Sequence, residues 1–291
     1  MMRCKHVIYT IGSLLIQSCI SVSNPTNVST EPCITTGTKV DCSSQNLTTI
    51  PFDQILPEVE WLILSNNEIN EIIETDLKQL ENLKTLDLSR NQLKKIHIQN
   101  LPSTVKSLYA NDNRITTLVT ESRINCTDVD THCGLEYLYL SNNHFSDFFL
   151  EIVAQSAFTK LKVVDFSWNK IVSLFGQVGN DHYGMMDLTS LNLKGNSIEY
   201  IHRDSGRFYG GFDIMPELRD LNLDTNLITE MHKNMFINTY LQTLNLDNNP
   251  IETFSGVNTT TLRTLYLRNE NLKSFDLGAG HKSSFFDGNF V

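Results

Sequence analysis

Few side chains in this sequence of 291 residues are spaced for catalysis. The histidines beyond the N-terminal segment are scattered, and none belongs to an H-E-x-x-H zinc motif or lies near a G-x-S-x-G nucleophile elbow. They are His97, His132, His144, His182, His202, His232 and His281. Acidic side chains mostly fill variable positions, where a solvated charge is the default. We therefore expect a binding protein rather than an enzyme, with no cofactor and no metal site.

The cysteines favour disulfide chemistry. Cys4 and Cys19 lie in the N-terminal segment, and the other four form two sequence-local pairs, Cys33–Cys42 and Cys126–Cys133. An even number of cysteines in an exported chain predicts disulfides, and neither pair has the C-x-x-C spacing of a zinc site. An intracellular scaffold is the alternative, and it predicts free thiols at Cys33 and Cys42.

The N-terminal segment predicts export. Arg3 and Lys5 precede an apolar run over residues 7–20, and Ser21 and Ser23 offer a small-residue cleavage site, so residues 1–23 are a predicted signal peptide. A single membrane anchor is the alternative, but the run is shorter than the ~20 apolar residues that span a bilayer. Four Asn-x-Ser/Thr triplets are then candidate glycosylation sites: Asn27, Asn46, Asn125 and Asn258.

The charge balance excludes one class of partner. The chain carries 33 acidic and 23 Lys or Arg residues, a net charge of −10. A general nucleic-acid binder needs a basic stripe that neutralises phosphates, so we expect no nucleic-acid partner. We also expect no docking on anionic membranes, and no later segment is apolar enough to span one.

An internal repeat dominates the sequence. The pattern L-x-x-L-x-L-x-x-N-x-L recurs eight times when conservative changes at the leucine positions are allowed, and a ninth copy, Leu262–Leu272, has Glu270 where asparagine belongs. The spacings between the repeated asparagines run from 22 to 30 residues, mostly within the range of leucine-rich repeats. These asparagines are Asn67, Asn91, Asn113, Asn143, Asn169, Asn196, Asn226 and Asn249.

The pattern has a physical reading. The L-x-L core is a short strand whose leucines point inward, while the residues between them face outward. The chain must turn after the strand, and an inward asparagine offers both a donor and an acceptor to backbone groups that would otherwise be buried without partners. The sequence predicts an α/β fold, a horseshoe solenoid of about nine repeats. Its concave face is a parallel β-sheet, and its convex side has irregular, 3-10 or short helical segments.

These residues resemble the extracellular leucine-rich repeats of Toll and Toll-like receptor ectodomains and of small leucine-rich proteoglycans. The segment Cys33 to Pro51 is similar to the N-terminal cysteine cap of that class, reduced to two cysteines. The predicted organisation is residues 1–23 signal peptide, 24–58 cap with a Cys33–Cys42 disulfide, 59–275 repeats and 276–291 tail. No C-terminal cysteine cap follows, so the chain also resembles short secreted insect leucine-rich immune molecules, or a truncated receptor ectodomain.

The repeat register places a set of aromatic residues on the outward face of the sheet. Tyr109, Tyr137, Tyr139 and Trp168 fall on three consecutive coils, and strands ~4.8 Å apart bring such rings together. Tyrosine and tryptophan are enriched in protein-binding hot spots. An aromatic cluster would also suit a sugar-stacking surface. The alternative is that these residues are simply good strand formers that cover one another.

Acidic residues also lie on this face. Asp165 and Asp220 belong to the outward columns and complete the predicted ligand-binding set. Asp220, Asp224 and Asp247 predict an acidic region that would favour a basic patch on a partner. The alternative is an ordinary solvated surface.

Two insertions interrupt the repeat. The first lies between Leu118 and Leu135 and holds Cys126–Cys133 and Asn125, and the second is the glycine- and arginine-rich segment 203–212. Each is either a contact loop or a tolerated insertion that packs on the convex side.

The sequence therefore predicts a secreted binding protein for a protein or glycan ligand on the concave sheet, acting in innate immunity as a soluble recognition or decoy molecule. The alternative is a component of the extracellular matrix or of cell adhesion and signalling. The ligand, the pathway and the oligomeric state are not encoded in the repeat.

Overall fold

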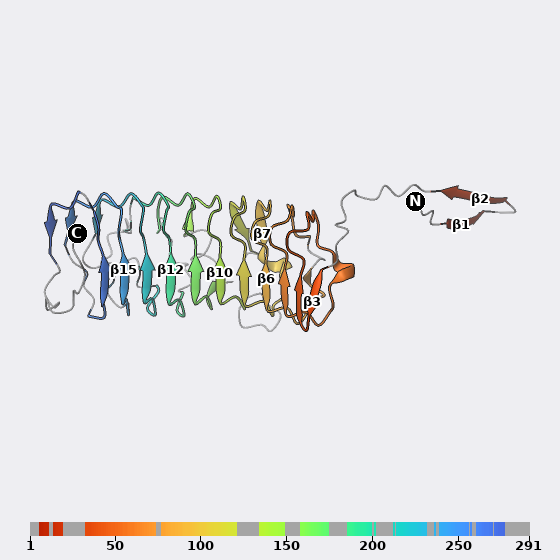
Figure 1. Cartoon of the computed structure of the whole chain (residues 1–291), viewed down its shortest axis with the longest axis horizontal. Coiled ribbons are helices and arrows are strands. Elements are labelled where there is room, and N and C mark those ends of the chain that lie inside the picture. Colours follow the sequence, from red (N-terminus) through yellow and green to blue (C-terminus); the bar gives the residue numbers. More distant parts are fainter. Residues whose placement is uncertain are drawn as a thin grey trace.

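The computed structural model describes residues 6–11, 14–19, 33–73, 77–120, 134–148, 158–174, 185–199, 201, 212, 214–231, 236, 239–255, 257, 260–269 and 271–276. An elongated row of coils carries a sheet along one side (Figure 1). This main sheet has 11 strands, and every pair in it is parallel except the terminal β3–β4 pair. The predicted solenoid is confirmed.

Each repeat contributes one strand of three residues to the main sheet. Because the middle leucine or valine of each strand pairs with its counterpart in the next coil, the repeat register is also the sheet register. In chain order the strands are β3 (Ile34–Thr36), β4 (Lys39–Asp41), β5 (Trp61–Ile63), β6 (Thr85–Asp87), β8 (Ser107–Tyr109), β10 (Tyr137–Tyr139), β11 (Val163–Asp165), β12 (Ser190–Asn192), β13 (Asp220–Asn222), β15 (Thr243–Asn245) and β17 (Thr264–Tyr266).

The side opposite the main sheet combines 3-10 turns with short strands. The predicted 3-10 segments are present as η1 (Phe52–Gln54) and η2 (Ile98–Asn100). The sequence pattern did not predict two small lateral sheets, which are also parallel. They consist of β7 (Lys95–His97) with β9 (Thr117–Val119), and of β14 (Glu230–Met231), β16 (Thr253–Phe254) and β18 (Ser274–Phe275).

The N-terminal segment forms a separate hairpin. β1 (His6–Ile11) pairs with β2 (Leu14–Cys19) in antiparallel register, and Figure 1 shows this hairpin apart from the coils. The assignment of residues 1–23 as a signal peptide is not tested by this arrangement and stays a prediction.

One continuous apolar core runs through the coils. The inward positions of the repeat, such as Leu86, Leu138 and Leu244, are fully buried. Phenylalanine side chains also pack in this core from Phe145 onward. Phe166 contacts Phe145 and Phe148 with ring centroids 4.9 and 5.5 Å apart. Burial of each such side chain contributes roughly 1.5–3 kcal/mol, and because every coil packs on its neighbours, the core is shared between repeats.

The inward asparagines form the predicted ladder. All eight are buried, with exposed fractions between 3% and 8%. Asn169 is typical: its Nδ2 donates to the carbonyls of Phe166 in its own coil and Leu140 in the preceding coil, at 3.0 Å each. Its Oδ1 accepts the N–H of Phe145 at 3.1 Å. Each asparagine therefore satisfies its own turn and joins two coils.

The ladder changes at its C-terminal end. Glu270 lies outside the described residues, but the preceding residue, Asn269, accepts the N–H of Asn249 at 2.8 Å. Its Nδ2 is buried without a hydrogen-bond partner. β17 and β18 nevertheless pair with β15 and β16, so the ninth coil forms without the full asparagine contact. The predicted end of the repeats at residue 275 stays a prediction.

The N-terminal cap imitates a repeat. Val40 and Cys42 take inward positions and are buried, and β4 pairs with β5 in parallel. The predicted Cys33–Cys42 disulfide is confirmed, with the two Cα atoms 4.4 Å apart. A crosslink over such a short loop is worth about 2–3 kcal/mol in the chain-entropy model. The disulfide therefore closes the β3–β4 hairpin, which joins the first coil through the pairing of β4 with β5.

Replacing a ladder asparagine tests the role of these contacts. We expect Asn169→Ala to lower the free energy of unfolding by about 2–4 kcal/mol, because the Phe145 N–H and the Leu140 carbonyl would remain buried without a partner. Urea unfolding followed by circular dichroism measures this loss. Asn70→Ala, at an exposed position, is the matched control and should change stability by less than about 0.5 kcal/mol. An equal effect of both changes would contradict the ladder's role.

Candidate functional site

The outward face of the main sheet presents two columns of side chains. In the column that ends each strand, Asp and Asn residues fold back on the chain, because their Oδ1 accepts the backbone N–H two residues later. The residues that close turns in this way are Asp41, Asp87, Asp165, Asn192, Asn222 and Asn245. Asp165, predicted as a ligand-binding residue, therefore also closes a turn, with its Oδ1 2.8 Å from the Ser167 nitrogen.

Tyrosines replace these turn-closing residues on two neighbouring coils. Tyr109 on β8 pairs in register with Tyr139 on β10. Their rings stack with centroids 4.6 Å apart and an interplanar angle of 4°. Tyr137 shares the face of Tyr139 because the two are separated by one residue of the same strand. The structure therefore brings together three of the four predicted aromatic residues, named here the tyrosine surface (Tyr109, Tyr137 and Tyr139).

One phenol of the tyrosine surface, that of Tyr139, is held in its neutral form. Burial raises the pKa of Tyr139 above its ordinary value of 10, and the neighbouring Tyr109, Tyr137 and Asp165 reinforce the shift. The phenol of Tyr139 thus stays protonated at physiological pH. Its hydroxyl can then donate and accept hydrogen bonds beside an apolar ring.

Trp168 does not join the tyrosine surface. It lies beyond the end of β11, and its ring leans over Gly195 in the following coil, whereas Tyr139 lies in the preceding coil. Trp168 is 52% exposed. The predicted cluster of four aromatic residues is therefore two separate features.

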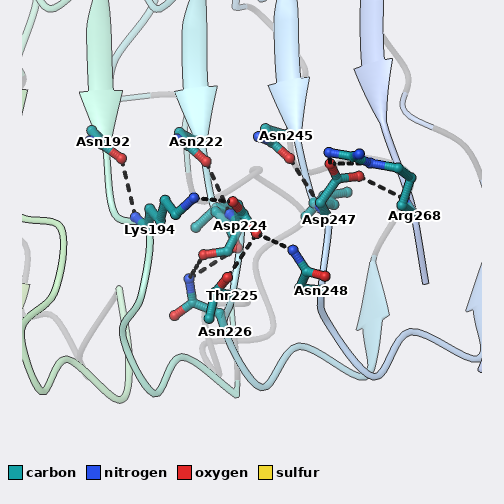
Figure 2. A network of polar contacts seen from close by, with 12 residues as sticks. Asn192, Lys194, Asn222, Asp224, Thr225, Asn226, Asn245, Asp247, Asn248 and Arg268 are labelled. Carbon is teal, nitrogen blue, oxygen red and sulfur yellow. Dashed lines mark hydrogen bonds and ion pairs between the residues drawn. The ribbon is translucent and has the colours of Figure 1, made fainter. Parts of the chain in front are cut away.

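The predicted acidic region is largely wrong. Asp220 is exposed, but Asp224 and Asp247 are only 6% and 1% exposed. Asp224 pairs with Lys194 at 2.6 Å and also accepts hydrogen bonds from Asn248 and Thr225 (Figure 2). Because both buried carboxylates are paired within the chain, they offer no free negative charge to a partner.

Asp247 and Arg268 form the second pair in Figure 2. The Arg268 guanidinium donates from Nε and Nη2 to Asp247 Oδ2 at 2.8 and 2.5 Å, and its backbone N–H donates to Oδ1 at 2.7 Å. These contacts raise the pKa of Arg268. They fall at the repeat position that holds Ser65, Ser89 and Ser167 in earlier coils. The repeat register showed that Asp247 and Arg268 share this position in neighbouring coils. Only the structure shows that their opposite charges form an ion pair.

A column of left-handed residues was also missed in the sequence. One residue per coil, directly before the ladder asparagine, has a positive φ angle. They are Asn66, Arg90, Asp112, Asn142, Trp168, Gly195, Thr225 and Asn248, and Ser44 takes the same place in the cap. The abundance of Asn, Asp and Gly at this position was the available signal, since these residues tolerate the left-handed region best.

Several predicted site residues lie outside the described residues. They include Cys126, Cys133, the sequons at Asn27, Asn125 and Asn258, and most of the segment 203–212. Asn46 is described and exposed, which suits a glycan. The part of the chain that the structure describes has no cluster of three potential metal ligands. Within those residues, no helix has the length and apolar character needed to cross a membrane.

The Lys194–Asp224 pair generates a prediction for acid stability. Burial acts to raise the pKa of Asp224, but hydrogen bonds from Lys194, Asn248 and Thr225 outweigh it and hold the pKa below its ordinary value. The ionised carboxylate therefore stabilises the fold above about pH 4, and this contribution is lost as the pH falls through the lowered pKa.

We expect Asp224→Asn to cost about 1–2 kcal/mol at pH 7 and much less near pH 2, measured by urea unfolding across this range. Asp220→Asn is the matched control, because Asp220 is exposed. A constant difference at all pH values would show that the charge of Asp224 does not stabilise the fold.

Comparison with known proteins follows the same repeat. Models of the leucine-rich repeat match residues 57–115 and 134–155. Lumican of Rattus norvegicus is 33% identical over 122 residues, which are 41% of this chain and 33% of lumican. The matched parts are less than half of each of the first curated relatives.

Two solved structures share the fold. A TLR13–ssRNA13 complex superposes with a TM-score of 0.58 at 21% identity, covering 80% of this chain and 34% of that one. A chain of the octameric complex of Latrophilin 3, Unc5D and FLRT2 superposes with a TM-score of 0.56 at 21% identity, covering 83% and 81%. The chain therefore contains leucine-rich repeats over the matched residues, and its fold resembles that of the chains matched in the TLR13 and Latrophilin 3–Unc5D–FLRT2 complexes.

Proposed function

We propose that the chain is a secreted recognition protein that binds a protein ligand through the tyrosine surface. The observation that carries this proposal is the stacked Tyr109–Tyr139 pair on the outward face of the main sheet. These rings take positions that close turns in the neighbouring coils, so their residue type is not required by the repeat. A rigid aromatic pair with hydroxyl groups is typical of a protein-binding hot spot.

The geometry favours a protein over a nucleic acid. Tyr109 and Tyr139 each cover one face of the other ring, so the pair leaves fewer open ring faces for stacked bases than two separate tyrosines would. The net charge of −10 also disfavours a phosphate backbone. A neutral surface that buries apolar area and offers hydrogen bonds suits a folded protein partner.

Two acidic residues extend the proposed contact. Asp220 on β13 is exposed, whereas Asp224 and Asp247 are buried. Asp165 pairs in register with Tyr139, and by closing its own turn it supports the strand end beside that ring. We assign Asp220 a direct role at the rim of the contact and Asp165 a supporting one.

More specifically, we propose that the protein acts in innate immunity, either as a soluble recognition molecule or as a decoy. The predicted signal peptide, the disulfide-bonded cap and the fold shared with TLR13 support it. The chain acts by binding in this proposal, and the sequence shows no catalytic motif that would suggest a reaction.

A role in adhesion or the extracellular matrix is the second candidate. The octameric complex of Latrophilin 3, Unc5D and FLRT2 joins leucine-rich repeats to two other proteins, and 81% of the matched chain is covered. The similarity to lumican points in the same direction as the predicted resemblance to small leucine-rich proteoglycans. Recovery of the protein with insoluble matrix rather than with body fluid would favour this candidate.

Truncation of the stacked pair tests the tyrosine surface. A partner is first purified on the immobilised protein from native fluid and identified by mass spectrometry. We expect the Tyr109→Ala, Tyr139→Ala double variant to bind this partner at least tenfold more weakly in surface plasmon resonance, because hot-spot aromatics contribute about 2 kcal/mol or more. Tyr240→Ala is the matched control, since Tyr240 is 54% exposed but lies outside the strands. Equal affinities for all three proteins would remove the tyrosine surface from consideration.

The mature N-terminus tests export. When the full chain is expressed in eukaryotic cells, we expect it in the medium with residues 1–23 removed, because the apolar run is read as a signal peptide. N-terminal sequencing shows whether residues 1–23 have been removed. A thiol count on the unfolded protein shows whether the disulfide has formed, since Cys33 and Cys42 should then not react. An uncleaved cytosolic product with free thiols at these positions would instead support an intracellular scaffold.

A further inference from the structure

Trp168 occupies a backbone position that disfavours it. Its φ angle is 56°, in the left-handed region that bulky side chains rarely adopt. The other coils place Asn, Asp, Arg, Thr or Gly at the equivalent position. Folding the turn thus does not require tryptophan here, and asparagine would adopt this conformation more easily. Trp168 is unfavourable at this backbone position and is still half exposed, which suggests a role other than stability.

The following coil leaves space for the Trp168 ring at a glycine. Gly195 is the glycine of the left-handed column, and a Cβ atom there would lie 2.4, 2.5 and 2.8 Å from Cε3, Cδ2 and Cζ3 of Trp168. Similar distances to three consecutive ring carbons place Gly195 beneath the face of the six-membered ring, not at its edge. Any other side chain at Gly195 would displace the ring.

With one face of the ring toward Gly195 and half of the residue exposed, we infer that the opposite face is directed outward. Side chains at this column project from the turn into solvent, as the exposed Asn66, Arg90 and Asn142 show. The ring lies where the Gly195 side chain would project, so it covers the glycine from the solvent side. This arrangement accounts for an exposed fraction of 52% in an indole that is held against backbone. The result is a flat, open aromatic platform on the rim of the main sheet.

The polar groups around the platform are neutralised in pairs. On the N-terminal side, Asn142 donates to Asp112 at 2.6 Å, and Asp112 pairs with Arg90. On the C-terminal side, Lys194 pairs with Asp224 at 2.6 Å. The coils adjacent to Trp168 therefore supply an amide, Asn142, and an ammonium group, Lys194, and each is bonded to a carboxylate one coil farther away. Such a site offers hydrogen bonds without selecting an ionic ligand.

We propose that the Trp168–Gly195 platform binds the ring of a neutral carbohydrate. The C–H face of a pyranose carries weak positive charge and stacks on the negative face of an indole, and its hydroxyls need donors and acceptors at the edge of the ring. A nucleobase would also stack, but its phosphates would meet no unpaired cation in these pairs. This site is separate from the tyrosine surface, so it stands whether or not that surface binds a protein.

The chain's two tryptophans make the platform directly observable. In Trp61→Phe, Trp168 is the remaining tryptophan and its emission reports on the platform alone. The probes are chitotetraose, cellotetraose and mannotetraose, with a heparin tetrasaccharide as the charged comparison. The protein is treated with a glycosidase first, so that attached glycans do not compete. We expect a saturable change in emission with at least one neutral probe, with a dissociation constant in the millimolar range typical of a single stacking contact.

Two variants separate binding from folding. Trp168→Asn installs the residue that Asn66, Asn142 and Asn248 supply in other coils, so we expect an unchanged or higher Tm and at least a tenfold loss of affinity in titration calorimetry. Gly195→Ala should shift the emission of Trp168 and weaken the same probe, because the added Cβ displaces the ring. The tyrosine double variant should retain sugar binding, which distinguishes this site from the proposed protein contact.

The outcomes decide between a ligand platform and a structural ring. Saturable binding of a neutral probe that Trp168→Asn abolishes in a stably folded protein would support the proposal. Three flat titrations in Trp61→Phe, or affinity that Trp168→Asn leaves within twofold, would overturn it. Binding of heparin alone would overturn the assignment to neutral sugars.

Discussion

Each coil of this protein must turn where its strand ends, and the turn leaves backbone groups facing the interior. The ladder asparagines satisfy those groups, and they do so across coils as well as within them: Asn169 contacts Phe166 in its own coil, and Leu140 and Phe145 in the preceding one. Water cannot replace these contacts in a closely packed core, so the amide fixes both the turn and the spacing of neighbouring coils. The straight columns of the outward face follow from this constraint.

A fixed register makes chemistry possible at positions far apart in the sequence. Tyr109 and Tyr139 are separated by 30 positions, yet they stack because their strands are paired in register. The same register sets Lys194 beside Asp224 and Asp247 beside Arg268, so two buried carboxylates become part of the scaffold. The repeat therefore provides one backbone on which each column can carry a separate interaction.

The four aromatic residues were predicted to form one cluster, but their local backbone conformations place them at two separate sites. Residues in a strand project perpendicular to the sheet, which holds the tyrosines together. Trp168 lies past the strand in a left-handed turn, and its ring lies against the next coil, where Gly195 leaves space. A stacked pair of tyrosines with hydroxyl groups and a single ring packed on a glycine suit different partners. The two features support separate proposals for this reason.

The sequence by itself determined the solenoid, the inward leucines and asparagines, the Cys33–Cys42 disulfide and the outward columns. All but the disulfide depend on periodicity, because a repeated period fixes which side chains face the core, and the disulfide followed from two cysteines close together in a chain predicted to be exported. The sequence placed Asp224 and Asp247 in an acidic patch because it could not show their partners in adjacent coils. It also grouped Trp168 with the tyrosines, since a pattern of residue types does not reveal a positive φ angle. Only the tertiary structure decided these points, because ion pairing and ring placement depend on the distances between coils.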